Sequence, residues 1–147
     1  MNRTAETLDW LREFEAHIDR PDVKNEKSIC WDWLPQEKDL DLYDRERWNK
    51  TDIMRKGNVE EAYRWVCDGL DALLKKHGYE RDDMYYRVNE PNHDTIVLFC
   101  HFGVECVMLS HLLNVSPMVL WHGLCAAPSS ITSIYTEERR KGSAGFV

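Results

Sequence analysis

The stretch Thr95-Ile-Val-Leu-Phe-Cys-His-Phe-Gly-Val-Glu-Cys-Val-Met108 decides the fold that we predict for this chain. Residues 95–100 are apolar after Thr95 and rich in β-branched and aromatic side chains, which is typical of a strand covered on both faces in a parallel sheet. His101 would stand at the carboxyl end of this strand, Gly103 would lie in the turn, and a helix would follow. The stretch therefore predicts an α/β unit that carries a histidine at the edge of its sheet.

This arrangement suits an anion. In open α/β sheets, ligands bind outside the carboxyl ends of the strands, and the next helix directs its first free N–H groups and its positive dipole end to the same place. A phosphate group would fit there, and His101 is a candidate binding residue for that reason. A single histidine after an apolar strand is also often a structural group, so the stretch alone leaves both interpretations open.

A second helix is predicted between Asn58 and Gly78. Apolar residues fall on one face of it, namely Val59, Ala62, Tyr63, Val66, Leu70, Leu73 and Leu74. Asn58 with Glu61 resembles a capping box at the start, and lysines precede Gly78 at the end. This interpretation explains Lys76-His77-Gly78 as the end of a helix.

We expect residues 1–147 to form one partial domain in which 21–57 is a cap-like irregular insertion. The insertion contains two prolines, scattered charges and the cluster Trp31-Asp32-Trp33. These tryptophans either form a lid over the site or pack the loop onto the body, and the bulk of aromatic side chains favours packing. After the second helix we predict a polar linker over 79–92 and strands over 131–136 and 144–147.

Composition excludes two classes of partner. The chain has 147 residues, 43% of them hydrophobic, and a formal net charge of −7, whereas nucleic-acid binding requires a basic surface. No apolar run reaches the ~18 residues of a membrane span, and no signal-peptide segment follows Met1. We therefore expect a globular, cytoplasmic protein that binds neither nucleic acid nor membrane.

The five cysteines are odd in number and form no Cys-x-x-Cys pair. Most have apolar neighbours, which is typical of reduced core thiols and not of a disulfide framework or a zinc site. Cys100 and Cys106 have the spacing of the Cys-x5-Arg loop of cysteine phosphatases, but a cysteine stands at 106 where that loop requires arginine. We reject that interpretation, and we expect no metal and no cofactor.

Further short segments accompany the His101 stretch in a fixed order. They are Arg3-Thr4-Ala5-Glu6, Leu11-Arg12-Glu13, Ser110-His111-Leu112-Leu113-Asn114, Ser129-Ser130-Ile131-Thr132 and Thr136-Glu137-Glu138-Arg139. In this order the chain resembles the histidine phosphatase superfamily, the phosphoglycerate-mutase-like group, with the best match from Asp94 to the C-terminus. The resemblance implies a three-layer α/β fold with a mostly parallel sheet flanked by helices, here N-terminally truncated.

The resemblance also implies roles for single residues. His101 is similar to the family's second active-site histidine, which contacts the phosphoryl group but is not the nucleophile. The N–H of Phe102 would donate to the phosphate in the same turn as Gly103, although many members have His-Gly-Gly where this chain has His-Phe-Gly. Glu13 is similar to the family's proton-donating glutamate, with Glu15 as the competing register. A carboxylic acid can protonate a leaving alkoxide, but a solvated surface charge explains Glu13 equally well.

One departure from the family matters more than these matches. The family's nucleophile lies in an Arg-His-Gly triplet, which occurs nowhere in this sequence. Trp121-His122-Gly123 follows the site histidine instead of preceding it, and Arg3 is in the wrong register for a second family arginine. The chain therefore resembles a member that begins about one βαβ unit late, roughly 30 or more residues short.

Two classes of function follow from the resemblance. The first is a phosphoric-ester hydrolase or phosphomutase that acts through a phosphohistidine whose nucleophile lies outside this chain, on a small phosphorylated substrate or inorganic phosphate. The alternative is a non-catalytic phosphate-binding or interaction fragment. Without the strand that carries the nucleophile, Thr95–Cys100 would be an open edge. We therefore expect a homo-oligomer, or an N-terminal segment that fills the gap.

Overall fold

The computed structural model describes residues 4–147, without the side chains of residues 37 and 38. Its α-helices are α1 (Asp52–Lys56), α2 (Val59–Lys76), α3 (Phe102–Leu113) and α4 (Pro117–Gly123). Three short 3-10 helices are η1 (Asp9–Leu11), η2 (Glu37–Tyr43) and η3 (Trp48–Lys50). The strands are β1 (His17–Asp19), β2 (Lys27–Ile29), β3 (Tyr79–Asp82), β4 (Tyr85–Val88), β5 (Thr136–Arg140) and β6 (Ser143–Phe146).

The strands form two small sheets. One pairs β1 with β2, and the other has the order β3-β4-β6-β5. Every strand pair among the described residues is antiparallel. The expected α/β fold with a mostly parallel sheet is therefore wrong for this chain.

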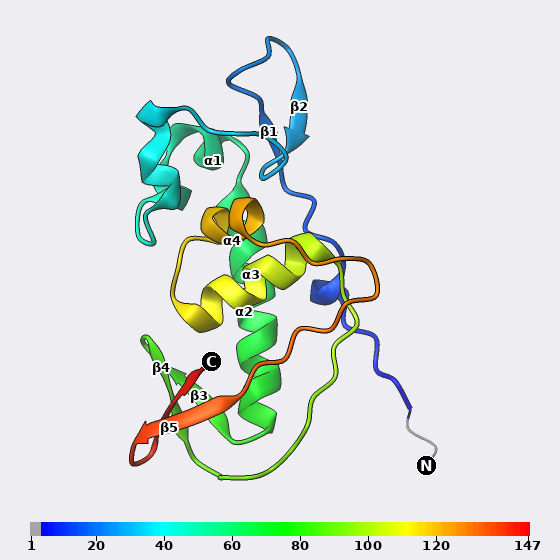
Figure 1. Ribbon diagram of the computed structural model, residues 1–147, viewed down its shortest axis with the longest axis vertical. Coiled ribbons are helices and arrows are strands. Elements are labelled where there is room, and N and C mark those ends of the chain that lie inside the picture. Colours follow the sequence, from blue (N-terminus) through cyan, green and yellow to red (C-terminus); the bar gives the residue numbers. More distant parts are fainter. Residues whose placement is uncertain (1–3) are drawn as a thin grey trace.

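The correction centres on residues 95–100, which were expected to be a buried strand. They have no regular secondary structure. Ile96 and Leu98 are half-buried against the core, whereas Val97 and Phe99 are exposed. A buried strand needs neighbours that accept and donate its backbone hydrogen bonds, and no segment within residues 4–147 supplies them. Figure 1 shows this part of the chain as an extended trace that leads into α3.

The C-terminal strands are only partly as predicted. Residues 131–135 lie outside the strands, and β5 begins at Thr136, although Tyr135 and Val147 exchange two backbone hydrogen bonds of 2.8 and 2.9 Å. The strand expected over 144–147 corresponds to β6. The segment predicted as a polar linker over 79–92 is instead the β3-β4 hairpin, whose turn contains Asp83 at φ 57°.

The helix predicted between Asn58 and Gly78 is confirmed as α2. Its end is set by Gly78, which has φ +87° and lies so close to Glu90 that a Cβ would be 2.5 Å from that residue's carbonyl oxygen. The capping box is wrong in detail. The side chain of Asn58 bonds the side chain of Glu61, not the helix backbone.

The hydrophobic core joins α2, α3 and α4 to the irregular segment before them. Figure 1 shows α3 crossing α2, with α4 beside it. Trp33 and Trp48 of the 21–57 segment are buried in this core, so these tryptophans pack the segment onto the body. Among the described residues, no helix has the length and apolar character needed to cross a membrane.

All five cysteines are free. Cys30, Cys67 and Cys106 are buried, as expected of core thiols. Cys100 and Cys125 are exposed and are the exceptions to this pattern.

Candidate functional site

The candidate site is the first turn of α3. His101 is the N-cap residue, with φ −107° and ψ 165°, and its side chain does not cap the helix. That side chain is exposed. His101 therefore lies at the start of a twelve-residue helix, as expected, although no strand precedes it.

Glu13 caps this helix from a distant part of the sequence. Its Oε1 accepts hydrogen bonds from the N–H of Val104, at 3.2 Å, and from the N–H of Phe14, at 2.7 Å. Glu13 and Val104 are 91 residues apart in the chain. A negative charge is favourable at a helix N-terminus because the free N–H groups and the helix dipole are positive there. The structure thus brings Glu13 and the 101–103 turn together, whereas Glu15 is exposed.

Gly103 is required by the closeness of these contacts. A Cβ at this position would lie 2.6 Å from Oε1 of Glu13 and 2.9 Å from Nε1 of Trp31. The carbonyl oxygen of Gly103 accepts a hydrogen bond of 3.0 Å from Nε1 of Trp121. The turn is therefore held from two sides by tryptophans.

The side chain of Phe102 is accommodated against Trp31. The two rings meet edge to face, with centroids 5.7 Å apart. Within residues 4–147, neither the N–H of Phe102 nor that of Gly103 has an acceptor. Phe102 is partly exposed whereas Gly103 is buried, so the N–H of Phe102 is the better placed of the two for an anion.

Arg12 and Arg139, the two arginines considered for this site, interact with other side chains. The guanidinium of Arg12 stacks on the ring of Trp65 at 5.0 Å, and Arg139 pairs with Glu137 within β5. A shallow hollow of about 330 Å³ adjoins Glu13 and is lined by Arg12 and Trp65 but not by His101. The charged side chain that contacts the turn from outside α3 is the Glu13 carboxylate, which has the same sign of charge as a phosphate.

The thiol of Cys100, next to His101, is not a nucleophile at neutral pH. Desolvation raises its pKa to about 11, and the negative charges of Glu105 and Glu13 add to the rise. A thiol with that pKa is protonated at pH 7, and only the thiolate attacks. Among residues 4–147 no cluster of His, Cys, Asp and Glu side chains that could hold a metal ion is found.

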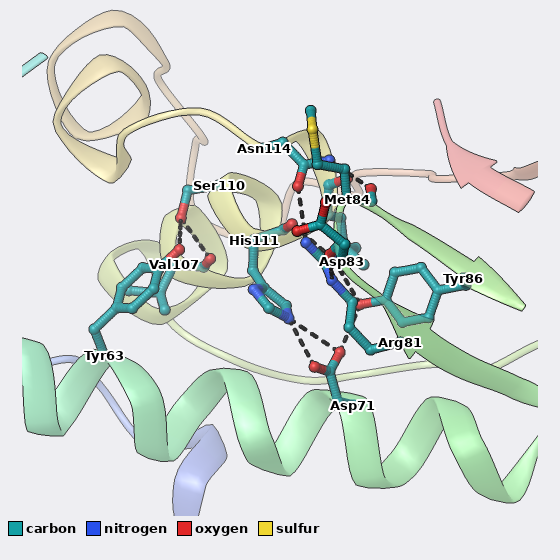
Figure 2. A network of polar contacts seen from close by, with 11 residues as sticks. Tyr63, Asp71, Arg81, Asp83, Met84, Tyr86, Val107, Ser110, His111 and Asn114 are labelled. Atoms are coloured by element: carbon teal, nitrogen blue, oxygen red, sulfur yellow. Dashed lines mark hydrogen bonds and ion pairs between the residues drawn. The ribbon is translucent and has the colours of Figure 1, made fainter. Parts of the chain in front are cut away.

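A second polar cluster lies between α2 and α3 (Figure 2). Both oxygens of Asp71 contact Nε2 of His111, at 3.0 and 2.9 Å, and Oδ1 accepts a hydrogen bond of 2.6 Å from the hydroxyl of Tyr86. Arg81 donates to the Tyr86 hydroxyl, to the carbonyl oxygen of His111 and to Oδ1 of Asn114. The cluster joins both helices to the β3-β4 hairpin.

This cluster contains a serine, a histidine and an aspartate but is not a catalytic triad. Ser110 Oγ bonds the hydroxyl of Tyr63, at 3.0 Å, and the carbonyl oxygen of Val107, at 2.8 Å. Figure 2 shows the Ser110 side chain turned toward Tyr63, away from His111. A serine nucleophile requires a hydrogen bond to its base, so we assign the cluster a structural role. The sequence analysis had missed Asp71, which has no motif around it.

Comparison of the chain with protein-family models, with curated proteins and with solved structures finds no match. The resemblance to the histidine phosphatase superfamily therefore stays a prediction from the residues quoted above. The contact between Glu13 and the first turn of α3 does not depend on that resemblance, since it is observed in the fold.

Proposed function

We propose that the protein handles phosphoric esters in the manner of the histidine phosphatases, as a hydrolase or phosphomutase whose nucleophilic histidine lies outside this chain. The observation that carries the proposal is the contact of Glu13 with the first turn of α3. Glu13 and His101, which were assigned different roles, lie far apart in the sequence, and both are placed at the N-terminus of α3: His101 is its N-cap residue, and Glu13 accepts from the N–H of Val104. Glu13 is therefore not a fully solvated surface carboxylate.

The arrangement supports a division of roles. The exposed imidazole of His101 and the free N–H group of Phe102 can stabilise negative charge on a transferring phosphoryl group. Only Oε1 of Glu13 is engaged by N–H groups, and Oε2 has no hydrogen-bond partner within residues 4–147. That second oxygen can carry the proton for a leaving alkoxide.

The chain by itself is expected to show no turnover of an aryl phosphate, because the sequence has no Arg-His-Gly nucleophile. Release of the aryl alcohol by the purified chain is the measurement. The His101→Ala variant is the control for contaminating phosphatases. Turnover that His101→Ala abolishes would contradict a nucleophile outside the chain.

Binding of inorganic phosphate is expected to be weak, with a dissociation constant in the millimolar range or above. Charge-assisted hydrogen bonds contribute ~1.5 to 3 kcal/mol each, and no arginine contacts the turn in the described part of the chain. Calorimetry with inorganic phosphate measures the affinity. Micromolar binding, or binding unaffected by His101→Ala, would count against the proposal.

Removal of the Glu13 charge is expected to strengthen phosphate binding by about 3- to 10-fold, because the carboxylate repels an anion a few ångströms away. Glu13→Gln keeps an oxygen that can accept the Val104 N–H. Glu15→Gln removes the same charge from an exposed position and serves as the matched control. Equal effects of the two variants would show that phosphate does not bind at the α3 turn.

A further inference from the structure

An extended segment without a hydrogen-bonded neighbour, residues 95–100, lies directly before the candidate site (Figure 1). The side chains of Ile96 and Leu98 face the core, while Val97 and Phe99 are 64% and 87% exposed. This alternation is that of a strand with one face on a core and one face in solvent. The segment thus alternates in burial as a strand does, although it has no regular secondary structure and no paired neighbour among the described residues.

The backbone of this segment is unpaired. Within residues 4–147, no N–H or C=O group of 95–100 takes part in a backbone hydrogen bond. β1, the strand of the N-terminal segment, pairs with β2 instead. From residue 4 onward, the N-terminal segment therefore does not pair with residues 95–100, contrary to the expectation that it fills the gap.

The edge also lacks the features that keep exposed strands apart. Lysines, prolines and inward charges normally prevent edge-to-edge pairing. No charged residue or proline occurs between Asp94 and His101, and the carboxylate of Asp94 is held by Nδ1 of His77 at 2.8 Å. The chain has a net charge of −7, so an uncharged edge is where two copies can approach with least repulsion.

We propose that residues 95–100 pair in antiparallel orientation with the same residues of a second copy, forming a symmetric dimer. The two-fold axis runs through the sheet at Leu98, so that Leu98 faces its counterpart. Val97 of each copy then lies opposite Phe99 of the other, which gives two pairs of a β-branched with an aromatic side chain, a favourable cross-strand combination. This register places the two exposed large apolar side chains of the segment, Val97 and Phe99, against each other.

The alternative symmetric register, centred on Val97, is less favourable. It would set Thr95 opposite Phe99 and Asp94 opposite Cys100, which leaves the Phe99 rings without an apolar partner across the strands. The register at Leu98 sets Thr95 opposite His101 and places no charged side chain opposite another of the same sign. It therefore buries more of the exposed apolar surface without cost in charge.

Light scattering after gel filtration tests the dimer. We expect the native chain to show twice the mass of one chain at micromolar concentration. Phe99→Lys should weaken dimerisation by about 100-fold or more, since it adds two charges at a paired edge. Leu34→Lys changes an apolar side chain that is also largely exposed, at 76%, and should leave the dimer intact. A monomeric native chain, or equal effects of the two variants, would overturn the proposal.

Disulfide cross-linking tests the register. Val97→Cys and Phe99→Cys are made separately, each with Cys100→Ser and Cys125→Ser to remove the exposed native thiols. The Leu98-centred register predicts that mild oxidation cross-links a mixture of the two variants, because directly opposite residues are within disulfide reach, and cross-links neither variant alone. Cross-linking of Val97→Cys alone would overturn this register. Val97 and Phe99 are exposed and are not part of the candidate phosphate site. The cross-linking result therefore tests the dimer separately from phosphate binding.

Discussion

Replacing Trp121 with alanine is expected to lower the free energy of unfolding by about 3–5 kcal/mol, the usual cost of removing a large buried aromatic side chain. Trp121 is 5% exposed. Its ring stacks on Phe14 at 5.5 Å and meets Trp48 at 6.3 Å. The substitution would leave a cavity between the N-terminal segment, α3 and α4 and would also remove the donor to the Gly103 carbonyl oxygen. Urea denaturation followed by circular dichroism measures the loss.

Two variants sharpen this measurement. Trp65→Ala makes the same chemical change at a side chain that is 43% exposed, and it should cost less than about 1.5 kcal/mol. Trp121→Phe keeps most of the bulk but leaves the Gly103 carbonyl oxygen without its donor, at a cost of about 1–3 kcal/mol. A Trp121→Ala loss no larger than that of Trp65→Ala would show that the packing around Trp121 does not stabilise the fold.

Replacing Asp71 with alanine is expected to cost about 2–4 kcal/mol, because it leaves His111 and the Tyr86 hydroxyl without their shared acceptor in a largely buried place. The side chains of Asp71 and His111 are 23% and 17% exposed. Asp68→Ala on the same helix, at an exposed position, is the control and should change stability by less than about 0.5 kcal/mol. Equal losses for the two variants would contradict a stabilising role for the cluster.

The same cluster predicts a dependence of stability on pH. Desolvation raises the pKa of Asp71, but the hydrogen bonds from His111 and Tyr86 lower it by more. The pKa of Asp71 in the folded state is therefore below its usual value of 3.8. A carboxyl with a lowered pKa in the folded state stabilises the fold above its unfolded-state pKa. That contribution is lost as the pH falls through the lowered pKa of the folded state. Unfolding of the native chain should therefore become easier below about pH 4, and Asp71→Ala should show a weaker dependence in this range.

Local patterns in the sequence predicted the helices better than the sheet. The apolar face between Asn58 and Gly78 fixed α2, since a helix satisfies its own backbone hydrogen bonds. The apolar run at 95–100 carries an equally clear strand pattern. A strand also needs a second strand to hydrogen-bond with, however, and the local sequence pattern does not show whether one is present. The β3-β4 hairpin was missed because its strands carry Glu80, Arg81 and Arg87, and their pairing is decided by tertiary contacts.

For the candidate site, the sequence suggested Glu13 and His101 but not their contacts. The order of the motifs selected Glu13 and His101, yet the two possible registers at 13 and 15 could be separated only by the fold, which directs Glu13 to the Val104 N–H. Asp71 could not be found in advance. Its hydrogen-bond partners His111 and Tyr86 come from α3 and β4, and no spacing rule joins residues that meet only after these elements have packed.

The hydrogen bond between Glu13 and the N–H of Val104 also couples the segment after η1 to the first turn of α3. We expect these two regions to unfold locally in one step. A helix start usually frays by itself, because its first N–H groups are held only weakly. Here the first turn of α3 takes its cap from the segment around η1, so detachment of that segment uncaps the helix and separates Glu13 from His101 in one event. We therefore expect a protease cut between Glu13 and β1 to loosen the first turn of α3, although the cut lies outside that helix. Faster hydrogen exchange of the Val104 amide after the cut would show this loosening.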